Sequence, residues 1–131
     1  MVGIDRRTGK LIDNFTSAVQ SIEVIFSTRL ASRVMRREFC GGAAELLGRL
    51  VTPKLFAIYQ QLVATAIDLW EPRFHVRRIV PQGSVEEIRA GKLGILLELD
   101  YRPRGHLGDF TVERVVKLTL FARNNGLQVI V

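Results

Sequence analysis

The sequence predicts an α+β domain in which N-terminal helices pack on one face of a small, mostly antiparallel sheet formed by the C-terminal half. Two observations predict this class. Apolar residues recur at helical spacing up to residue 71, and from residue 74 onward they alternate with polar residues, as they do in strands. The 131 residues fit a single domain, residues 1–131, and a hydrophobic fraction of 47% excludes a disordered chain.

The chain opens on a charged segment, residues 1–13, which has no apolar period. We expect an irregular N-terminal arm with a turn at Thr8-Gly9. The first helix is predicted to begin at about residue 14, with Asn14 or Thr16 as its N-cap. Spacings of three, four and one place its apolar residues on one face, and these are Phe15, Val19, Ile22, Ile25, Phe26 and Leu30.

A second long helix follows a basic connector over residues 28–42 and a predicted short helix over residues 43–50. Thr52 is the expected N-cap and Pro53 the first helical residue, where the missing N–H of proline does no harm. Pro72 ends the helix, because proline disfavours helical geometry in the residue before it. The predicted apolar stripe consists of Leu55, Ile58, Tyr59, Leu62, Ala66 and Leu69.

Four strands are predicted in the C-terminal half. The first contains Phe74, Val76 and, after a shift of phase, Ile79, and the clearest signal is the alternation over 93–101. Residues 85–92 hold either one helical turn or a hairpin connection, and residues 102–109 form a loop. The third strand, 111–121, places Val112, Val116, Leu118 and Leu120 on one face. A turn at Asn125-Gly126 leads to the fourth strand, 127–131.

Composition excludes several classes of protein. One cysteine rules out an internal disulfide, and with two histidines it is a poor supply of zinc ligands. No apolar run reaches the ~20 residues of a membrane span, and the N-terminal residues lack the apolar stretch of a signal peptide. We therefore expect a domain from a reducing compartment with no metal, no cofactor and no membrane contact. The net charge of +6, carried mostly by arginine, suits either a polyanion or a protein interface.

Isolated candidate residues give weak signals for catalysis or metal binding. Cys40 has no evident helical histidine partner and is interpreted as a small residue at the end of the connector. His75 and His106 lie in a strand and a loop with no third ligand in view. A metal site and a cysteine nucleophile are therefore not expected.

Two further clusters support alternative functions. Asp68 and Glu71, three residues apart beside Trp70, could form the acid pair of a sugar-cleaving enzyme, although carboxylates at a helix end are common. Trp70 is read most simply as a residue of the core or its edge. The arginines between Arg29 and Arg37 could grip a phosphate backbone, but stacking aromatics and a recognition helix are missing, so a solvated basic face is the simpler interpretation.

The segment 70–76 offers a more specific feature. Pro72 fixes a sharp helix-to-strand corner and holds Glu71 and Arg73 on either side of it. A rigid corner with one acid and one guanidinium suits recognition of a partner's charged or backbone groups, because little side-chain entropy is lost. From the residues alone, a structural corner and a partner contact are equally open.

The residues of this corner resemble the sequence signature of a known family. Glu71-Pro72-Arg73 after a helix is similar to the Glu-Pro-Arg signature of the small baseplate wedge proteins of contractile-tailed bacteriophages. The same family includes the lysozyme-like baseplate subunits of type VI secretion systems and related contractile injection systems. Residues 6–9 resemble its entry turn, and residues 20–39 resemble its first helix and the arginine-rich segment after it. The resemblance extends from about residue 3 to about residue 121.

The resemblance implies a non-enzymatic structural subunit of the virion tail baseplate, made in the cytoplasm of the host bacterium. Its implied partners are the larger wedge subunits, which form a core bundle, the tail sheath protein, and the central hub or spike, with no nucleic acid. Sheath subunits in such machines join by adding strands to a small sheet, and an open-edged meander over residues 93–131 would suit that step. The residues expected to contact partners are Glu71, Pro72, Arg73, Arg33, Arg36 and Arg37. A peptidoglycan-cleaving, lysozyme-like enzyme and a basic nucleic-acid-binding module are the alternatives.

Overall fold

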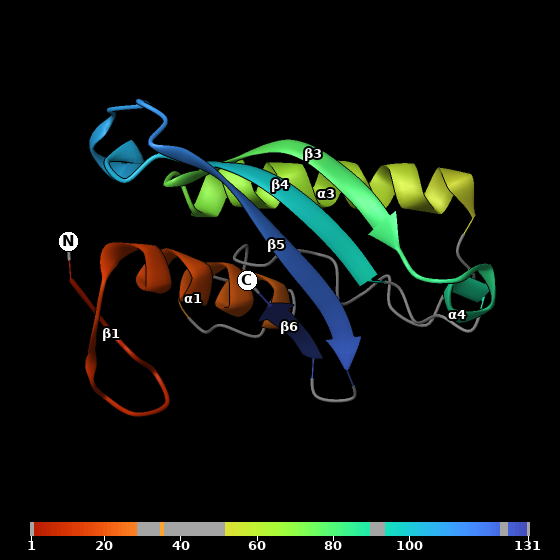
Figure 1. Ribbon diagram of the computed structural model, residues 1–131, viewed down its shortest axis with the longest axis horizontal. Coiled ribbons are helices and arrows are strands. Elements are labelled where there is room, and N and C mark those ends of the chain that lie inside the picture. Colours follow the sequence, from red (N-terminus) through yellow and green to blue (C-terminus); the bar gives the residue numbers. More distant parts are fainter. Residues whose placement is uncertain (1, 29–34, 36–51, 90–93, 124–125, 131) are drawn as a thin grey trace.

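A computed structural model describes residues 2–28, 35, 52–89, 94–123 and 126–130 (Figure 1). Two long helices and a four-stranded sheet dominate this part of the chain, which confirms the predicted α+β class. In chain order the elements are β1 (Gly3–Ile4), β2 (Leu11–Ile12), α1 (Asn14–Ser27), α3 (Pro53–Trp70), β3 (Phe74–Gln82), α4 (Val85–Arg89), β4 (Gly94–Tyr101), the 3-10 turn η1 (Gly105–Leu107), β5 (Arg114–Arg123) and β6 (Gly126–Ile130).

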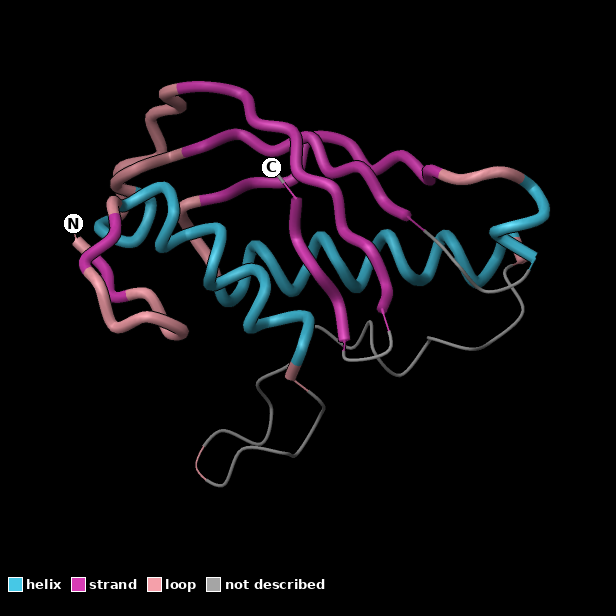
Figure 2. The backbone as a smooth tube through the Cα atoms, turned by 60° about the horizontal axis from the view of Figure 1, so that its bottom comes forward, coloured by secondary structure: helices cyan, strands magenta, loops and turns pink. Residues whose placement is uncertain are grey.

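The sheet is an antiparallel meander with strand order β3-β4-β5-β6. Figure 2 shows α1 and α3 on the same side of this sheet. Helix α3 packs against β3, and α1 packs against β6. The register of β3 shifts between Val76 and Arg78, so a bulge at this point confirms the predicted change of phase before Ile79.

The core lies between the two helices and the inward face of the sheet. Successive residues of β4 alternate in direction, and Ile95, Leu97 and Leu99 are at most 1% exposed, as the sequence predicted. The inward residues of β5 are also buried, with Val116 8% exposed and Leu118 and Leu120 at most 1% exposed. The other large side chains that are almost fully buried are Ile22, Ile25 and Phe26 of α1, Val63 and Ile67 of α3, Phe74 of β3, and Leu118 and Leu120 of β5.

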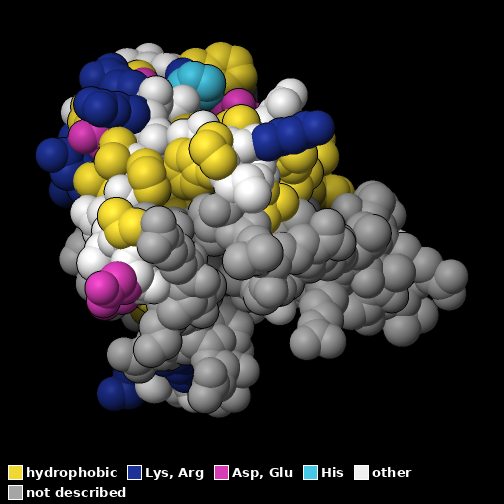
Figure 3. Space-filling view, turned by 90° about the vertical axis from the view of Figure 1, so that its right-hand side faces the viewer, with side chains coloured by type: hydrophobic (Ala, Val, Ile, Leu, Met, Phe, Trp, Pro, Cys, Tyr) yellow, Lys and Arg dark blue, Asp and Glu magenta, His cyan; other side chains and the backbone are white. Residues whose placement is uncertain are grey.

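The buried face of α3 differs from the predicted stripe. Tyr59 and Ala66 face the core as expected, but Val63 and Ile67 accompany them. The prediction was wrong for Ile58, Leu62 and Leu69, which are 46%, 37% and 65% exposed. Apolar residues surround most of this helix, so their period alone could not select the buried side. Figure 3 looks at the end of the molecule near α4 and shows hydrophobic side chains gathered at the surface.

Both long helices begin at a capping side chain. The carboxylate of Asp13 accepts a hydrogen bond from the Thr16 N–H at 3.3 Å, so Asp13 is the N-cap of α1 and the predicted caps, Asn14 and Thr16, are wrong. Asp13 lies in the extended conformation that a cap requires. The hydroxyl of Thr52 accepts from the Leu55 N–H at 3.1 Å, which confirms the predicted start of α3.

The N-terminal arm is more regular than predicted. β1 and β2 pair in an antiparallel ladder, with Gly3 opposite Ile12. The Gly9 N–H donates to the Asp5 carbonyl at 2.8 Å, and Gly9 has a φ of 71°, a conformation that glycine adopts without a steric penalty. The expected turn at Thr8-Gly9 therefore closes a short hairpin. Its strands are only two residues long, too short to show an alternating apolar pattern in the sequence.

Strand β5 begins later than predicted. It starts at Arg114, so Val112 lies outside the strand and is 41% exposed instead of facing the core. The carboxylate of Asp109 accepts hydrogen bonds from the N–H and the hydroxyl of Thr111, at 3.1 and 2.7 Å. These local bonds stabilise a turn in place of a strand ladder.

One helical turn, α4, occupies residues 85–89 of the segment 85–92, for which a helical turn and a hairpin connection were both predicted as alternatives. Ser84 and Glu87 cap it reciprocally, because each side chain accepts a hydrogen bond from the other residue's N–H, at 3.2 and 2.9 Å. The predicted short helix at 43–50 lies outside the described residues, as does most of the connector 28–42. Within the described ranges, no helix is long and apolar enough to cross a membrane.

Candidate functional site

The helix-to-strand corner at residues 71–73 contains a buried ion pair. Glu71 is 4% exposed and Arg73 is 5% exposed. Nε of Arg73 lies 2.7 Å from one carboxylate oxygen of Glu71, and Nη2 lies 2.9 Å from the other. Two N–H donors thus meet the two oxygens in parallel, which is the strong, two-pronged form of this interaction. The pair connects the end of α3 to the start of β3.

The remaining donors of Arg73 reach α1. Nη1 donates to the side-chain oxygen of Asn14 at 2.9 Å and to its carbonyl oxygen at 3.3 Å, and Nη2 lies 3.5 Å from the Ser21 hydroxyl. The amide nitrogen of Asn14 in turn donates to the Pro103 carbonyl at 3.0 Å. One guanidinium therefore fixes the positions of α1, α3 and β3, and Asn14 extends the network to the loop after β4.

The loop between β4 and β5, residues 102–113, rests directly on the corner. The Arg102 N–H donates to the Arg73 carbonyl at 2.7 Å. A Cβ atom at Gly105 would lie 2.1 Å from the carbonyl oxygen of Pro72, so only glycine allows this contact. The corner therefore determines where the loop sits.

Aromatic side chains support the same region from inside. The rings of Phe15 and Tyr101 meet edge to face at 5.2 Å, and Phe74 lies 5.5 Å from Tyr101. The guanidinium of Arg114 lies 4.5 Å from the centre of the Phe15 ring, a cation–π contact. Trp70 is partly buried against the core, which confirms its predicted place at the core edge.

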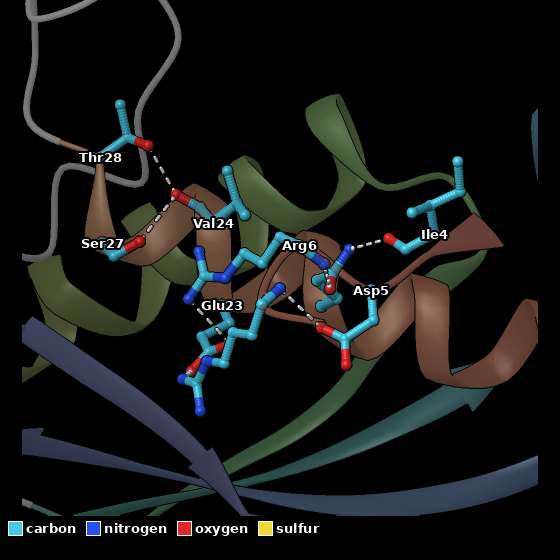
Figure 4. A network of polar contacts seen from close by, with 9 residues as sticks. Ile4, Asp5, Arg6, Glu23, Val24, Ser27 and Thr28 are labelled. Carbon is cyan, nitrogen blue, oxygen red and sulfur yellow. Dashed lines mark hydrogen bonds and ion pairs between the residues drawn. The ribbon is translucent and has the colours of Figure 1, made fainter. Parts of the chain in front are cut away.

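The N-terminal hairpin is attached to α1 by polar contacts (Figure 4). The Gln20 side chain joins the hairpin to α1, donating to the Ile4 carbonyl at 3.1 Å and accepting from the Arg6 N–H at 2.9 Å. The guanidinium groups of Arg6 and Arg7 lie 3.0 and 3.2 Å from the carboxylate of Glu23. Because Arg7 is largely exposed, its ion pair adds little stability, and the Gln20 bridge positions the hairpin more firmly.

The structure brings three of the six predicted contact residues together. Glu71 and Arg73 face each other and are buried, and Arg73 also contacts α1, so in the chain alone their charged groups are not available to a partner. Pro72 is partly buried. Contact of these residues with a partner therefore stays a prediction. The other three, Arg33, Arg36 and Arg37, lie outside the described residues, and so does Cys40.

The candidate acid pair does not point to a common space. Both oxygens of Glu71 are bonded to Arg73, whereas the carboxylate of Asp68 lies at the surface, 3.0 Å from Nδ1 of His75. His106 is exposed in η1. In the described part of the chain, no three metal-ligating side chains gather into a group that could hold an ion.

Sequence reasoning missed two features of the corner. Asn14 and Ser21 are seven residues apart, which places them on one face of α1, and this spacing could have marked them as partners of a buried polar group. Gly105 was read as an ordinary loop residue, although its close approach to Pro72 requires glycine. Both features depend on contacts across more than 30 residues of sequence.

Comparison with protein families identifies the chain. The family model described as "Baseplate wedge protein gp25" matches residues 16–106, well over half of the sequence. The chain belongs to the gp25 baseplate wedge protein family. The corner at residues 71–73 and the first five residues of the loop that it supports, 102–106, both lie within the matched segment. The protein is thus a structural wedge subunit in the baseplate of a contractile, tail-like assembly. Comparison with curated proteins gives no match.

Solved structures with the same fold include subunits of contractile assemblies. A chain of the pyocin R2 baseplate in its post-contraction state is 29% identical, with a TM-score of 0.67 over 77% of this chain and 98% of its own. A candidate tail lysozyme from Geobacter sulfurreducens is 23% identical, with a TM-score of 0.64 over 88% and 96%. A chain of the anti-feeding prophage baseplate is 24% identical, with a TM-score of 0.63 over 78% and 80%. The last two likenesses show the fold alone.

Proposed function

We propose that this wedge protein joins the core bundle of the larger wedge subunits to the first ring of the tail sheath, and that it has no catalytic activity. The observation that carries the proposal is the end of the meander. Strand β6 pairs with β5 and with no other strand in the described part of the chain. The outer edge of such a strand offers backbone N–H and C=O groups to an added strand, so an extended arm of a sheath subunit can continue the sheet.

The opposite edge of the sheet is less suited to an added strand. The side-chain amide of Gln60 donates to the Ile79 carbonyl at 3.2 Å, and Pro81 has no N–H to offer. The bulge between Val76 and Arg78 interrupts the regular spacing of backbone groups in β3. These features are typical of protected sheet edges. We therefore assign the incoming sheath arm to β6.

Two proline variants test this assignment. Successive backbone N–H groups of a strand point to opposite edges, and proline has no N–H. Of the two variants Gln128→Pro and Val129→Pro, one therefore loses a hydrogen bond to β5, and the other loses only an N–H that points to the outer edge of the sheet. Thermal unfolding identifies the variant that keeps the bond to β5, because its stability should be unchanged. We expect that variant to enter the baseplate but to recruit less sheath, counted by electron microscopy of assembled particles. Normal sheath recruitment by that variant would contradict the assignment to β6.

Peptidoglycan cleavage is the competing function, favoured by the likeness to a candidate tail lysozyme. The contacts of Glu71 oppose it, because both carboxylate oxygens are bonded to Arg73, and the other candidate acid, Asp68, contacts His75 instead. We expect the wild-type chain to release no soluble fragments from purified peptidoglycan. Turnover by the wild type that disappears in a folded Glu71→Gln variant would favour the enzyme instead.

Nucleic-acid binding is the second alternative and rests on the net charge of +6. A phosphate-binding chain would show affinity that falls steeply with salt, and that affinity would depend on Arg33, Arg36 and Arg37. In our proposal these arginines contact protein partners. The triple alanine variant should therefore recover less wedge or sheath protein in a pull-down. A loss confined to DNA or RNA binding would support the alternative.

A further inference from the structure

The outward side of helix α3 exposes three large apolar side chains. Ile58, Leu62 and Leu69 are 46%, 37% and 65% exposed. Successive helical residues turn by about 100°, so these side chains lie in one arc, centred on the side opposite the fully buried Val63. An exposed apolar face on a long helix usually marks a site of interaction. The exposed residues of this arc, here called the outer face of α3, are Lys54, Ala57, Ile58, Gln61, Leu62, Thr65, Asp68 and Leu69.

The two charged residues of α3 lie at opposite ends of this outer face. Lys54 is in the first turn and Asp68 in the last, about 21 Å apart along the helix axis. Each charge lies at the end of the helix where the helix dipole disfavours it. Asp68 contacts His75, but its side chain remains 47% exposed. A partner that brought an acid to the first turn and a base to the last would therefore complement this face.

We propose that two copies of the free chain pair through the outer face of α3, with the two helices antiparallel about a two-fold axis at Gln61. In this arrangement, residues equally distant from Gln61 lie opposite each other. Lys54 and Asp68 are each seven residues away, so Lys54 of either copy meets Asp68 of the other. The pairing is isologous and closes on two copies. It concerns the chain before it enters a baseplate, so the proposed function does not depend on it.

The rest of the outer face also suits pairing with itself. Ala57 and Thr65, each four residues from Gln61, lie opposite each other, and their small size allows the helices to approach closely. Gln61 meets its own copy, and an amide group can donate to and accept from an identical amide. Parallel helices would instead place like charges together at both ends. One helix face per copy is a small interface beside the ~1,200–2,000 Å² of stable complexes, so we expect a reversible dimer.

Sedimentation velocity of the full-length chain, from micromolar to millimolar concentration, tests the pairing. The decisive variant is Ile58→Gln/Leu69→Gln, because glutamine removes the apolar groups and keeps a good helix propensity. The matched control is Ile4→Gln/Leu11→Gln on the N-terminal hairpin, where the two residues are 63% and 77% exposed. We expect the wild type and the control to dimerise equally and the α3 variant to dimerise at least tenfold more weakly. Thermal unfolding checks that all three chains are folded.

Charge reversal tests the antiparallel arrangement. Lys54→Glu and Asp68→Lys each place like charges at both ends, so either should weaken the dimer about tenfold. An equimolar mixture of these two variants should recover it, because opposite charges then meet at both ends. A dimer that neither reversal weakens would overturn the arrangement, and a wild type that is monomeric at every concentration would overturn the pairing. If that monomer recovers wedge or sheath protein and Ile58→Gln/Leu69→Gln does not, the outer face binds that partner instead.

Discussion

Replacing Arg73 by methionine tests the buried pair most severely. The substitution keeps an unbranched apolar stem but removes the cation, so the buried Glu71 carboxylate loses its charged partner and keeps only the backbone N–H of residue 73, at 3.4 Å. It also removes the donors that reach Asn14 at 2.9 and 3.3 Å. Removing one member of a buried ion pair costs about 3–5 kcal/mol. Because domains are stable by only about 5–15 kcal/mol, the variant should retain a fraction of the native stability.

Three companion variants separate charge from geometry. Arg73→Lys keeps the charge, but a single ammonium group cannot span Glu71 and Asn14, so we expect a smaller loss of about 1–2 kcal/mol. Glu71→Leu/Arg73→Met removes both charges and should be more stable than Arg73→Met alone. Arg7→Met breaks a surface pair with Glu23, in which Arg7 is 68% exposed, and should change stability by less than about 1 kcal/mol.

Urea unfolding followed by circular dichroism measures these differences as shifts of the midpoint at constant slope. In thermal unfolding, Arg73→Met should melt about 10–20 °C below the wild type. Equal midpoints for Arg73→Met and the wild type would refute the reasoning, because they would mean that Glu71 needs no buried cation. Both charged groups would then be free for direct contact with a wedge subunit.

Three further predictions concern single sites. Gly105→Ala should lower the unfolding free energy by about 1–3 kcal/mol, because its Cβ would meet the Pro72 carbonyl, and urea midpoints measure the loss. Burial raises the pKa of Tyr59 to about 12, so the contribution of Tyr59 to stability should be constant below pH 10 and fall as pH rises from 10 to 12, when only the unfolded chain ionises at Tyr59. Ultraviolet titration of the phenol checks this value, and a Tyr59 that ionises near 10 in the folded chain would contradict it. Hydrogen bonds lower the pKa of three exposed carboxyl groups. The stability that these groups contribute should therefore be present above pH 4 and be lost as pH falls through the lowered pKa values. Acid unfolding of the wild type and of asparagine variants at these positions measures the loss. These carboxyls belong to Asp5, Asp13 and Asp109.

Local pattern predicted the sheet better than it predicted the helices. Alternation along β4 identified Ile95, Leu97 and Leu99 as inward residues, because a strand has only two faces to choose between. Helix α3 is apolar on most sides, so its pattern could not decide between Leu62 and Val63. The choice is made by tertiary packing against β3, which a single helix does not encode.

The candidate site shows a similar limit. The sequence located the corner at residues 71–73 and the rigid geometry that Pro72 imposes there. It could not show that Arg73 turns inward, because the groups that attract it, Asn14 and Ser21, lie more than 50 residues away. The contact between the corner and the loop after β4 was missed for the same reason. The exposed Leu107 and Phe110 of this loop carry no period, and only the fold shows that they protrude together.

The most direct test of the account is an electron cryomicroscopy map of the assembled baseplate that contains this chain. We predict that the chain lies between the wedge core and the first sheath ring, with an additional strand from a sheath subunit paired to β6. A map in which the chain lies elsewhere, with no contact to either the wedge core or the sheath, would contradict the account.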